Sequence, residues 1–201
     1  YIQNKRFDEA LATFDAARKV NPSDPELDRN WADTKIKAYE AEIEALRAEG
    51  KEEEAYDKEV EKAQFAFDDL LRRVESYPND LGLRYELGVV YYDNEAYDDA
   101  IQQFQLAQKS PKHRLEALYY LACCFKAKGQ PDMAVMQLEA ANSQLPTMDD
   151  LKKRVVYTLG VIAEEAGDNA KAFDYFKDVY AADIGFLDIG ERMQRLHAAG
   201  K

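Results

Sequence analysis

Apolar residues recur along this chain at three- and four-residue intervals, and this pattern itself repeats. Ala66, Ala100 and Ala134 lie 34 residues apart, and the residues around the last two match in step. The matching pairs are Leu87 with Leu121, Tyr91 with Phe125, Phe104 with Leu138, and Ala107 with Ala141. Apolar residues at this spacing predict amphipathic helices, and the fixed period predicts a helix-turn-helix unit that is stable only when stacked on its neighbours.

One interval departs from this period, because Pro22 and Pro78 are 56 residues apart, 22 more than one unit. Two apolar stripes at helical spacing fill it: Ala32, Ile36, Tyr39, Ile43 and Leu46, then Tyr56, Val60, Ala63, Phe67, Leu70, Val74 and Tyr77. Gly50 and Lys51 form the natural turn between them. The pattern predicts two long antiparallel helices, each about 11 residues longer than usual and projecting roughly 16 Å at 1.5 Å per residue.

Charge is concentrated on this projecting hairpin. Residues 40–62 hold ten acidic and four basic side chains, a net charge of −6, which is half of the chain's −12. This sign is wrong for wrapping phosphate backbones, so we expect no nucleic-acid partner. Apolar residues make up 46% of the chain, which predicts a folded protein. No apolar run reaches the roughly 18–20 residues that would span a membrane.

The last residues predict a separate short helix. Asp188 and Glu191 have the spacing of a helix start, and Ile189, Met193 and Leu196 then form an apolar stripe. A helix with one apolar and one polar face is suited to cover the open end of a stack. The sequence therefore predicts a C-terminal capping helix.

No residues with catalytic, cofactor-binding or metal-binding spacing occur in the sequence. The only histidines are His113 and His197, and neither has a second ligand at the spacing that metal sites use. The many carboxylates form no calcium-type loop, and charge runs of this kind are usually solvated. We therefore predict no catalytic residues, no cofactor and no metal.

The two cysteines are sequence neighbours. Inside a helix the side chains of Cys123 and Cys124 point roughly 100° apart, so a bridge between them would need an unusual backbone. We interpret them as free thiols, with Cys124 packed in the core and Cys123 exposed on the inner face. Reduced cysteines favour the cytoplasm, although the sequence does not assign a compartment.

The repeating unit resembles the tetratricopeptide repeat. Counting from residue 81, positions 7, 8, 11, 20, 24 and 27 hold Leu87, Gly88, Tyr91, Ala100, Phe104 and Ala107. Counting from residue 115, the same positions and position 32 hold Leu121, Ala122, Phe125, Ala134, Leu138, Ala141 and Pro146. The unit from 153 keeps Leu159, Gly160, Ala172 and Phe176, and the first residues match with Tyr1, Ala10, Phe14, Ala17 and Pro22. The resemblance covers nearly the whole chain.

This resemblance implies an all-α fold, a right-handed α-solenoid of antiparallel helix-turn-helix repeats with one overlong helical hairpin and a C-terminal capping helix. We expect residues 1–201 to form a single domain. Its predicted parts are the second half of a truncated repeat (1–24), an extended repeat with the acidic hairpin (25–80), three repeats (81–114, 115–152 and 153–186), and the capping helix (187–201).

In proteins that this chain resembles, six positions of each repeat's first helix line a concave groove. The predicted protein-binding groove comprises Arg29, Tyr85, Val89, Tyr92, Tyr119, Tyr120, Cys123, Lys126, Arg154, Tyr157, Val161 and Glu164. Tyrosine offers a large contact area and a hydroxyl, which suits peptide recognition. The alternative is that these tyrosines are packing between adjacent units.

The predicted partner follows from a comparison of charges. Chaperone-binding members of the family hold a partner's terminal carboxylate with cationic and amide side chains. The corresponding positions here, counted from the long unit, hold Arg29, Asp33, Glu86, Glu116 and Tyr120. Three acids would repel an acidic tail, so a basic or aromatic-apolar segment is the better match.

Three functions are compatible with these residues. The leading hypothesis is a non-enzymatic scaffold or adaptor that binds a peptide or helix of a partner protein in its groove. The alternative is a structural, homo-oligomerising module that assembles through the acidic arm, with Ala41, Ala45 and Ala55 packed against another chain. The third is the non-catalytic part of a larger enzyme, because the chain opens in the middle of a hairpin and we expect its true N-terminus elsewhere.

Overall fold

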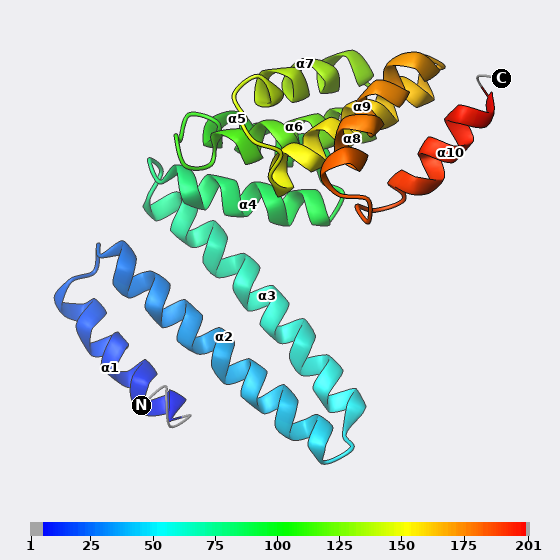
Figure 1. Cartoon of the computed structure of the whole chain (residues 1–201). Helices are drawn as coiled ribbons and strands as arrows, with labels where there is room; N and C mark the ends of the chain where they lie inside the picture. The colour runs from blue at the N-terminus through cyan, green and yellow to red at the C-terminus, as the bar shows by residue number, and fades with distance from the viewer. Residues whose placement is uncertain (1–5, 200–201) are drawn as a thin grey trace. The chain divides into compact units, whose positions relative to one another are not determined.

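A computed structural model describes residues 6–199, and all regular structure in this range is helical (Figure 1). The helices are α1 (Phe7–Val20), α2 (Pro25–Ala48), α3 (Glu52–Ser76), α4 (Leu81–Asp93), α5 (Tyr97–Ala107), α6 (Arg114–Ala127), α7 (Pro131–Asn142), α8 (Asp150–Glu165), α9 (Asn169–Ala182) and α10 (Ile189–Ala199). The predicted all-α class is confirmed. Tyr1, which was matched to the first repeat, lies outside the described residues.

The chain divides into two compact units, Tyr1–Leu83 and Arg84–Lys201. The boundary falls in the first turn of α4. The single domain expected from the repeats stays a prediction.

Unit 1 contains the overlong hairpin, and this prediction is confirmed. Helices α2 and α3 have 24 and 25 residues and lie side by side in Figure 1. Helix α2 begins where the Asp24 carboxylate accepts hydrogen bonds from the backbone N–H groups of Glu26 and Leu27, at 2.9 and 3.2 Å. The turn between the helices uses Gly50 at φ 75°, a conformation that favours glycine.

Over residues 55–65 the hairpin buries a different face of α3 from the predicted stripe. The Phe65 ring lies 5.7 Å from Trp31 and 5.9 Å from Tyr39, both on α2. Ala55, which the assembly alternative places against another chain, is fully buried within this one. Successive helix residues are about 100° apart, so burying Ala55 turns Tyr56 away from α2. Tyr56 is consequently 65% exposed.

A buried carboxylate joins the three helices of unit 1. Asp28 of α2 is only 3% exposed and lies 2.9 Å from Nε of Arg18, on α1. It also accepts hydrogen bonds from Arg72 of α3, at 3.0 Å, and from the hydroxyl of Tyr77, which follows α3, at 2.8 Å. These partners satisfy a charge that would otherwise be costly to bury.

In unit 2 two of the repeats pack through a pair of a glycine and a phenylalanine. A Cβ added to Gly88 would lie 2.7 Å from the Phe104 ring, and one added to Gly160 would lie 2.5 Å from Phe176. Both rings are fully buried. The absent side chain therefore lets each helix pair approach closely enough to bury a phenyl ring.

The chain closes with the predicted C-terminal helix. Helix α10 packs on α9 and buries Ile189 and Leu196, which belong to the apolar stripe identified in the sequence. Asp188 directly precedes the helix, as its spacing from Glu191 predicts.

Candidate functional site

The predicted groove residues of unit 2 lie on α4, α6 and α8, the first helices of successive repeats. All eleven of them, from Tyr85 to Glu164, are neither fully buried nor fully exposed. This intermediate burial is what a helix face has when packed residues border an open surface. The remaining predicted groove residue, Arg29, differs from these eleven because it lies on α2 in unit 1 and is exposed.

A cluster of tyrosines forms the centre of this surface. The Tyr120 ring stacks on Phe104 with 5.1 Å between ring centroids, and it meets Tyr92 edge-on at 5.3 Å. It also contacts Tyr119 at 5.7 Å and Tyr85 at 6.0 Å. We call Tyr85, Tyr92, Tyr119 and Tyr120 the tyrosine cluster. Edge-on and stacked contacts of this kind stabilise packing, so the cluster is part of the repeat core as well as its surface.

These phenols are neutral at physiological pH, as an ordinary pKa of 10 already requires, and burial makes them harder still to ionise. It raises the pKa of Tyr85 to about 12 and raises the pKa of Tyr92 and Tyr119 as well. The cluster therefore presents uncharged aromatic surface and hydroxyl groups rather than phenolates.

Cys123 is less accessible than its position in the repeat predicts. Its thiol is half-buried and in hydrogen-bonding contact with the hydroxyls of Tyr92 and Tyr119. Burial raises the pKa of this thiol despite those contacts, and burial raises that of Cys124 to about 12. Neither sulfur has the lowered pKa of a reactive cysteine.

Two cations border the tyrosine cluster. The Arg154 guanidinium lies 5.3 Å from the Tyr119 ring centroid, within the range of a cation–π interaction. Lys126 donates a hydrogen bond to Glu165 of α8 at 2.8 Å. These side chains, with the half-buried Val89 and Val161, give the surface an aromatic-apolar centre and a polar edge.

Tyr157 and Glu164 have a second role that the repeat pattern does not reveal. Arg192 of α10 pairs with the Glu164 carboxylate, and Arg192 Nε lies 3.0 Å from the Tyr157 hydroxyl. Arg195 adds a 2.9 Å contact to Glu164, and the Tyr157 hydroxyl donates to Asp188. Burial raises the pKa of Asp188, but the hydrogen bonds from Tyr157 and Arg192 outweigh this and lower it overall. Both groove residues thus anchor the C-terminal helix.

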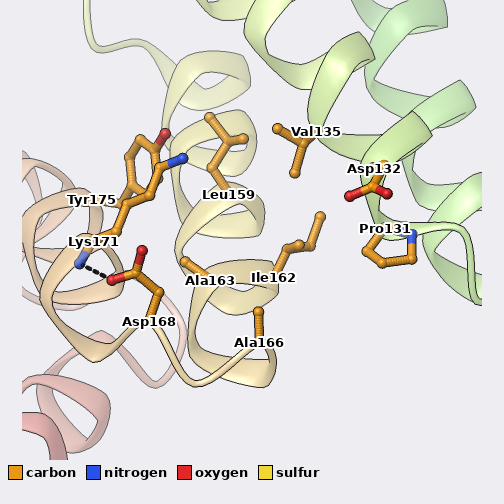
Figure 2. A pocket seen from close by; sticks show the side chains of 10 residues that line it. All are labelled: Pro131, Asp132, Val135, Leu159, Ile162, Ala163, Ala166, Asp168, Lys171 and Tyr175. Atoms are coloured by element: carbon orange, nitrogen blue, oxygen red, sulfur yellow. Dashed lines mark hydrogen bonds between the residues drawn. The ribbon is translucent and has the colours of Figure 1, made fainter.

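Unit 2 also has a cavity that the sequence did not predict (Figure 2). Its volume is about 320 Å³, and it lies between α7, α8 and α9. Leu159, Ile162 and Ala163 of α8 are apolar residues of its lining, and Asp132 and Asp168 supply carboxylates. The Asp168 carboxylate accepts from the backbone N–H of Lys171 at 3.1 Å, so it is the N-cap of α9. The lining residues come from three helices, so the apolar pattern of any one helix could not predict the cavity.

One of the two histidines, His113, packs against an aromatic ring. His113 stacks on Tyr85 with 4.7 Å between ring centroids. Within residues 6–199 no group of three or more His, Cys, Asp or Glu side chains could hold a metal ion. None of the described helices is both long and apolar enough to cross a membrane.

Comparison with known proteins identifies the class of protein. Residues 53–114 and residues 116–147 match two family models, each described as a tetratricopeptide repeat. These two segments of the chain are therefore tetratricopeptide repeats. A mouse (Mus musculus) relative, Tetratricopeptide repeat protein 14, is 28% identical over 115 residues, which are 56% of this chain. The matched part is 15% of that relative's length.

Solved structures show the same fold. YrrB, described as a TPR protein with an unusual peptide-binding site, aligns with a TM-score of 0.63 and 20% identity over 93% of this chain and 83% of its own. MamA aligns with a TM-score of 0.61 and 20% identity, over 89% and 90% of the two chains. A thermophilic TPR protein from Thermus thermophilus aligns with a TM-score of 0.56 and 18% identity, over 96% and 91%.

Proposed function

We propose that this chain is a non-enzymatic scaffold that binds a peptide or helix of a partner protein over the tyrosine cluster. The repeat fold is consistent with protein–protein interaction, and the tyrosine cluster is the observation that supports this location. Its rings are neutral, half-buried and held by one another, so binding a peptide orders few side chains and loses little entropy.

The surface favours an aromatic-apolar segment with basic flanks. Apolar side chains can contact the tyrosine rings, while the carboxylates at the edge, such as Glu116 and Asp93, attract cations. YrrB has the same fold and is described as having a peptide-binding site. Peptide binding is therefore the activity to test first in this chain.

The experiment selects peptides from a phage-displayed library on the full chain and measures the affinity of those that are enriched by fluorescence anisotropy. Val161→Arg places a long charged side chain on the surface of α8. Met136→Arg introduces the same charge at a 51% exposed residue of α7 and is the matched control. Circular dichroism is used first, to check that both variants keep the wild-type helix content.

We expect Val161→Arg to weaken binding by about tenfold or more, which is the effect of losing a central interface contact. Met136→Arg should leave the affinity within about twofold, as for a residue outside the interface. Peptides that lose affinity with Met136→Arg and keep it with Val161→Arg would contradict the proposed location.

A further inference from the structure

Part of the apolar stripe on α3 is exposed. Tyr56 and Val60 are 65% and 52% exposed, and Ala63 is exposed beside them. Their spacing of four and three residues is that of a coiled-coil seam, and it continues into Leu70 and Val74, which are buried. We call Tyr56, Val60 and Ala63 the outer stripe.

The hairpin does not need the outer stripe to hold its helices together. Ion pairs cross between α2 and α3 instead: Arg47 with Glu59 at 2.7 Å, Lys58 with Glu42 at 3.5 Å, and Lys62 with Glu40 at 3.7 Å. Phe65 and Ala55 supply apolar contact on the same side. Apolar residues that lie at coiled-coil spacing and are more than half exposed mark a surface for another helix.

The charges around the outer stripe indicate what kind of partner helix would bind there. All four basic side chains of residues 40–62 are engaged in ion pairs within the hairpin, and Lys51 pairs with Glu49 at 2.8 Å. Glu53 and Asp57 border the outer stripe, and neither forms an ion pair with any residue of the described range. The stripe is therefore flanked by unneutralised carboxylates, in a segment whose net charge is −6.

We propose that the outer stripe binds a basic amphipathic helix of a partner protein, which packs along α3 as the third helix of a bundle. Apolar residues of the partner cover Tyr56 and Val60, and its flanking lysines or arginines pair with Glu53 and Asp57. A second copy of this chain fits poorly, since two arms of charge −6 repel each other. The outer stripe belongs to unit 1 and the tyrosine cluster to unit 2, and the proposal does not depend on the peptide-binding function.

The test uses three synthetic peptides and the full chain. The basic peptide has three heptads with leucine at the seam and lysine at the flanking positions. The acidic peptide replaces those lysines with glutamate, and the scrambled peptide has the basic composition without the seam. Binding is measured by fluorescence anisotropy at low and high salt, and sedimentation velocity records the oligomeric state of the chain alone.

Two double variants locate the binding. Tyr56→Ser/Val60→Ser removes the exposed apolar groups of α3, whereas Met133→Ser/Met136→Ser removes two exposed apolar side chains of α7 as the matched control. We expect the basic peptide to bind the wild type, and to bind the α3 variant at least about tenfold more weakly, with the control unchanged. Binding should weaken with salt, because the flanking charges are exposed.

Four results would overturn the proposal. The first three are no binding of the basic peptide, equal binding of the scrambled or acidic peptide, and normal binding by the α3 variant. The fourth is a wild-type dimer that the α3 variant abolishes, which would assign the stripe to a second copy. Normal binding of the basic peptide by Val161→Arg separates this surface from the function proposed for the tyrosine cluster.

Discussion

The α2–α3 hairpin and the repeats of unit 2 are both built from antiparallel helix pairs, yet they are held together by different chemistry. In the hairpin, charged side chains face each other across much of the interface, and Asp28 is buried among three partners. In the repeats, Gly88 and Gly160 admit the rings of Phe104 and Phe176 at distances that leave no room for a methyl group.

This difference shows that close packing and ion pairs make different contributions to the stability of a helix pair. Close packing of a ring on a glycine fixes one geometry and buries apolar area, which gives the larger stabilisation. Ion pairs near water contribute less, but they leave the apolar face of α3 available for another contact. The following predictions test this contrast, in order of decreasing effect.

The largest effect should come from removing a buried ring. Phe176→Ala should destabilise unit 2 by about 3–5 kcal/mol, because it loses apolar burial and leaves a cavity. Phe65→Ala, in the partly open hairpin interface, should cost about half as much or less. Hydrogen exchange read by mass spectrometry measures the two units separately. Equal losses at the two sites would contradict the contrast.

Removing the buried carboxylate should have the next largest effect. Asp28→Ala should destabilise unit 1 by roughly 2–3 kcal/mol, less than for a fully buried pair because Arg18 and Arg72 keep contact with water. Urea unfolding, compared with Glu61→Ala at an exposed ion pair, measures the difference. Equal stability of the two variants would show that the network contributes no more than a surface pair.

Asp28 should also make unit 1 sensitive to acid. Burial raises its pKa, but hydrogen bonds from Arg72 and Tyr77 and the charge of Arg18 outweigh this, so the folded pKa lies below the ordinary value of 3.8. A lowered folded pKa means that the stabilisation is present above pH 3.8 and is lost as the pH falls through the folded pKa. Asp28→Asn should flatten this part of the pH profile, and an unchanged profile would assign the acid sensitivity elsewhere.

Adding a methyl group at the close contact should have an intermediate effect. Gly88→Ala should destabilise unit 2 by about 1–2 kcal/mol, because the overpacking exceeds the gain in helix propensity. The equivalent positions of the next repeat hold Ala122 and Leu138, so Phe104→Leu should relieve the clash. A double-mutant cycle measures this coupling.

The same substitution without a clash is the matched control. Gly190 of α10 has nothing within 4 Å of an added Cβ, so Gly190→Ala should stabilise the protein by about 0.5–1 kcal/mol. A loss of stability at Gly190, or no coupling between Gly88 and Phe104, would refute the packing explanation.

The smallest effect is expected at the tip of the hairpin. Arg47→Ala removes an ion pair with Glu59 in which both side chains are more than a third exposed, and it should cost about 0.2–1 kcal/mol. The loss should shrink in high salt, measured by urea unfolding. A loss that is large and independent of salt would mean that Arg47 stabilises the arm through packing of its aliphatic chain rather than through the ion pair.

The sequence by itself determined the helices and their class. The 34-residue period and the length of the interval from Pro22 to Pro78 predicted the repeats and the two long helices, because side-chain spacing records which residues share a helix face. It also predicted that α10 would be a separate helix with an apolar stripe.

Only the tertiary structure decided which face meets which neighbour. The stripe through Tyr56 and Val60 has the right spacing for a core, but the rotation of α3 that packs Phe65 on Trp31 and Tyr39 leaves it exposed. Tyr157 and Glu164 have groove positions, but Arg192 engages both. Spacing fixes directions around one helix, whereas the rotation of a helix and its long-range ion pairs depend on residues far apart in the chain.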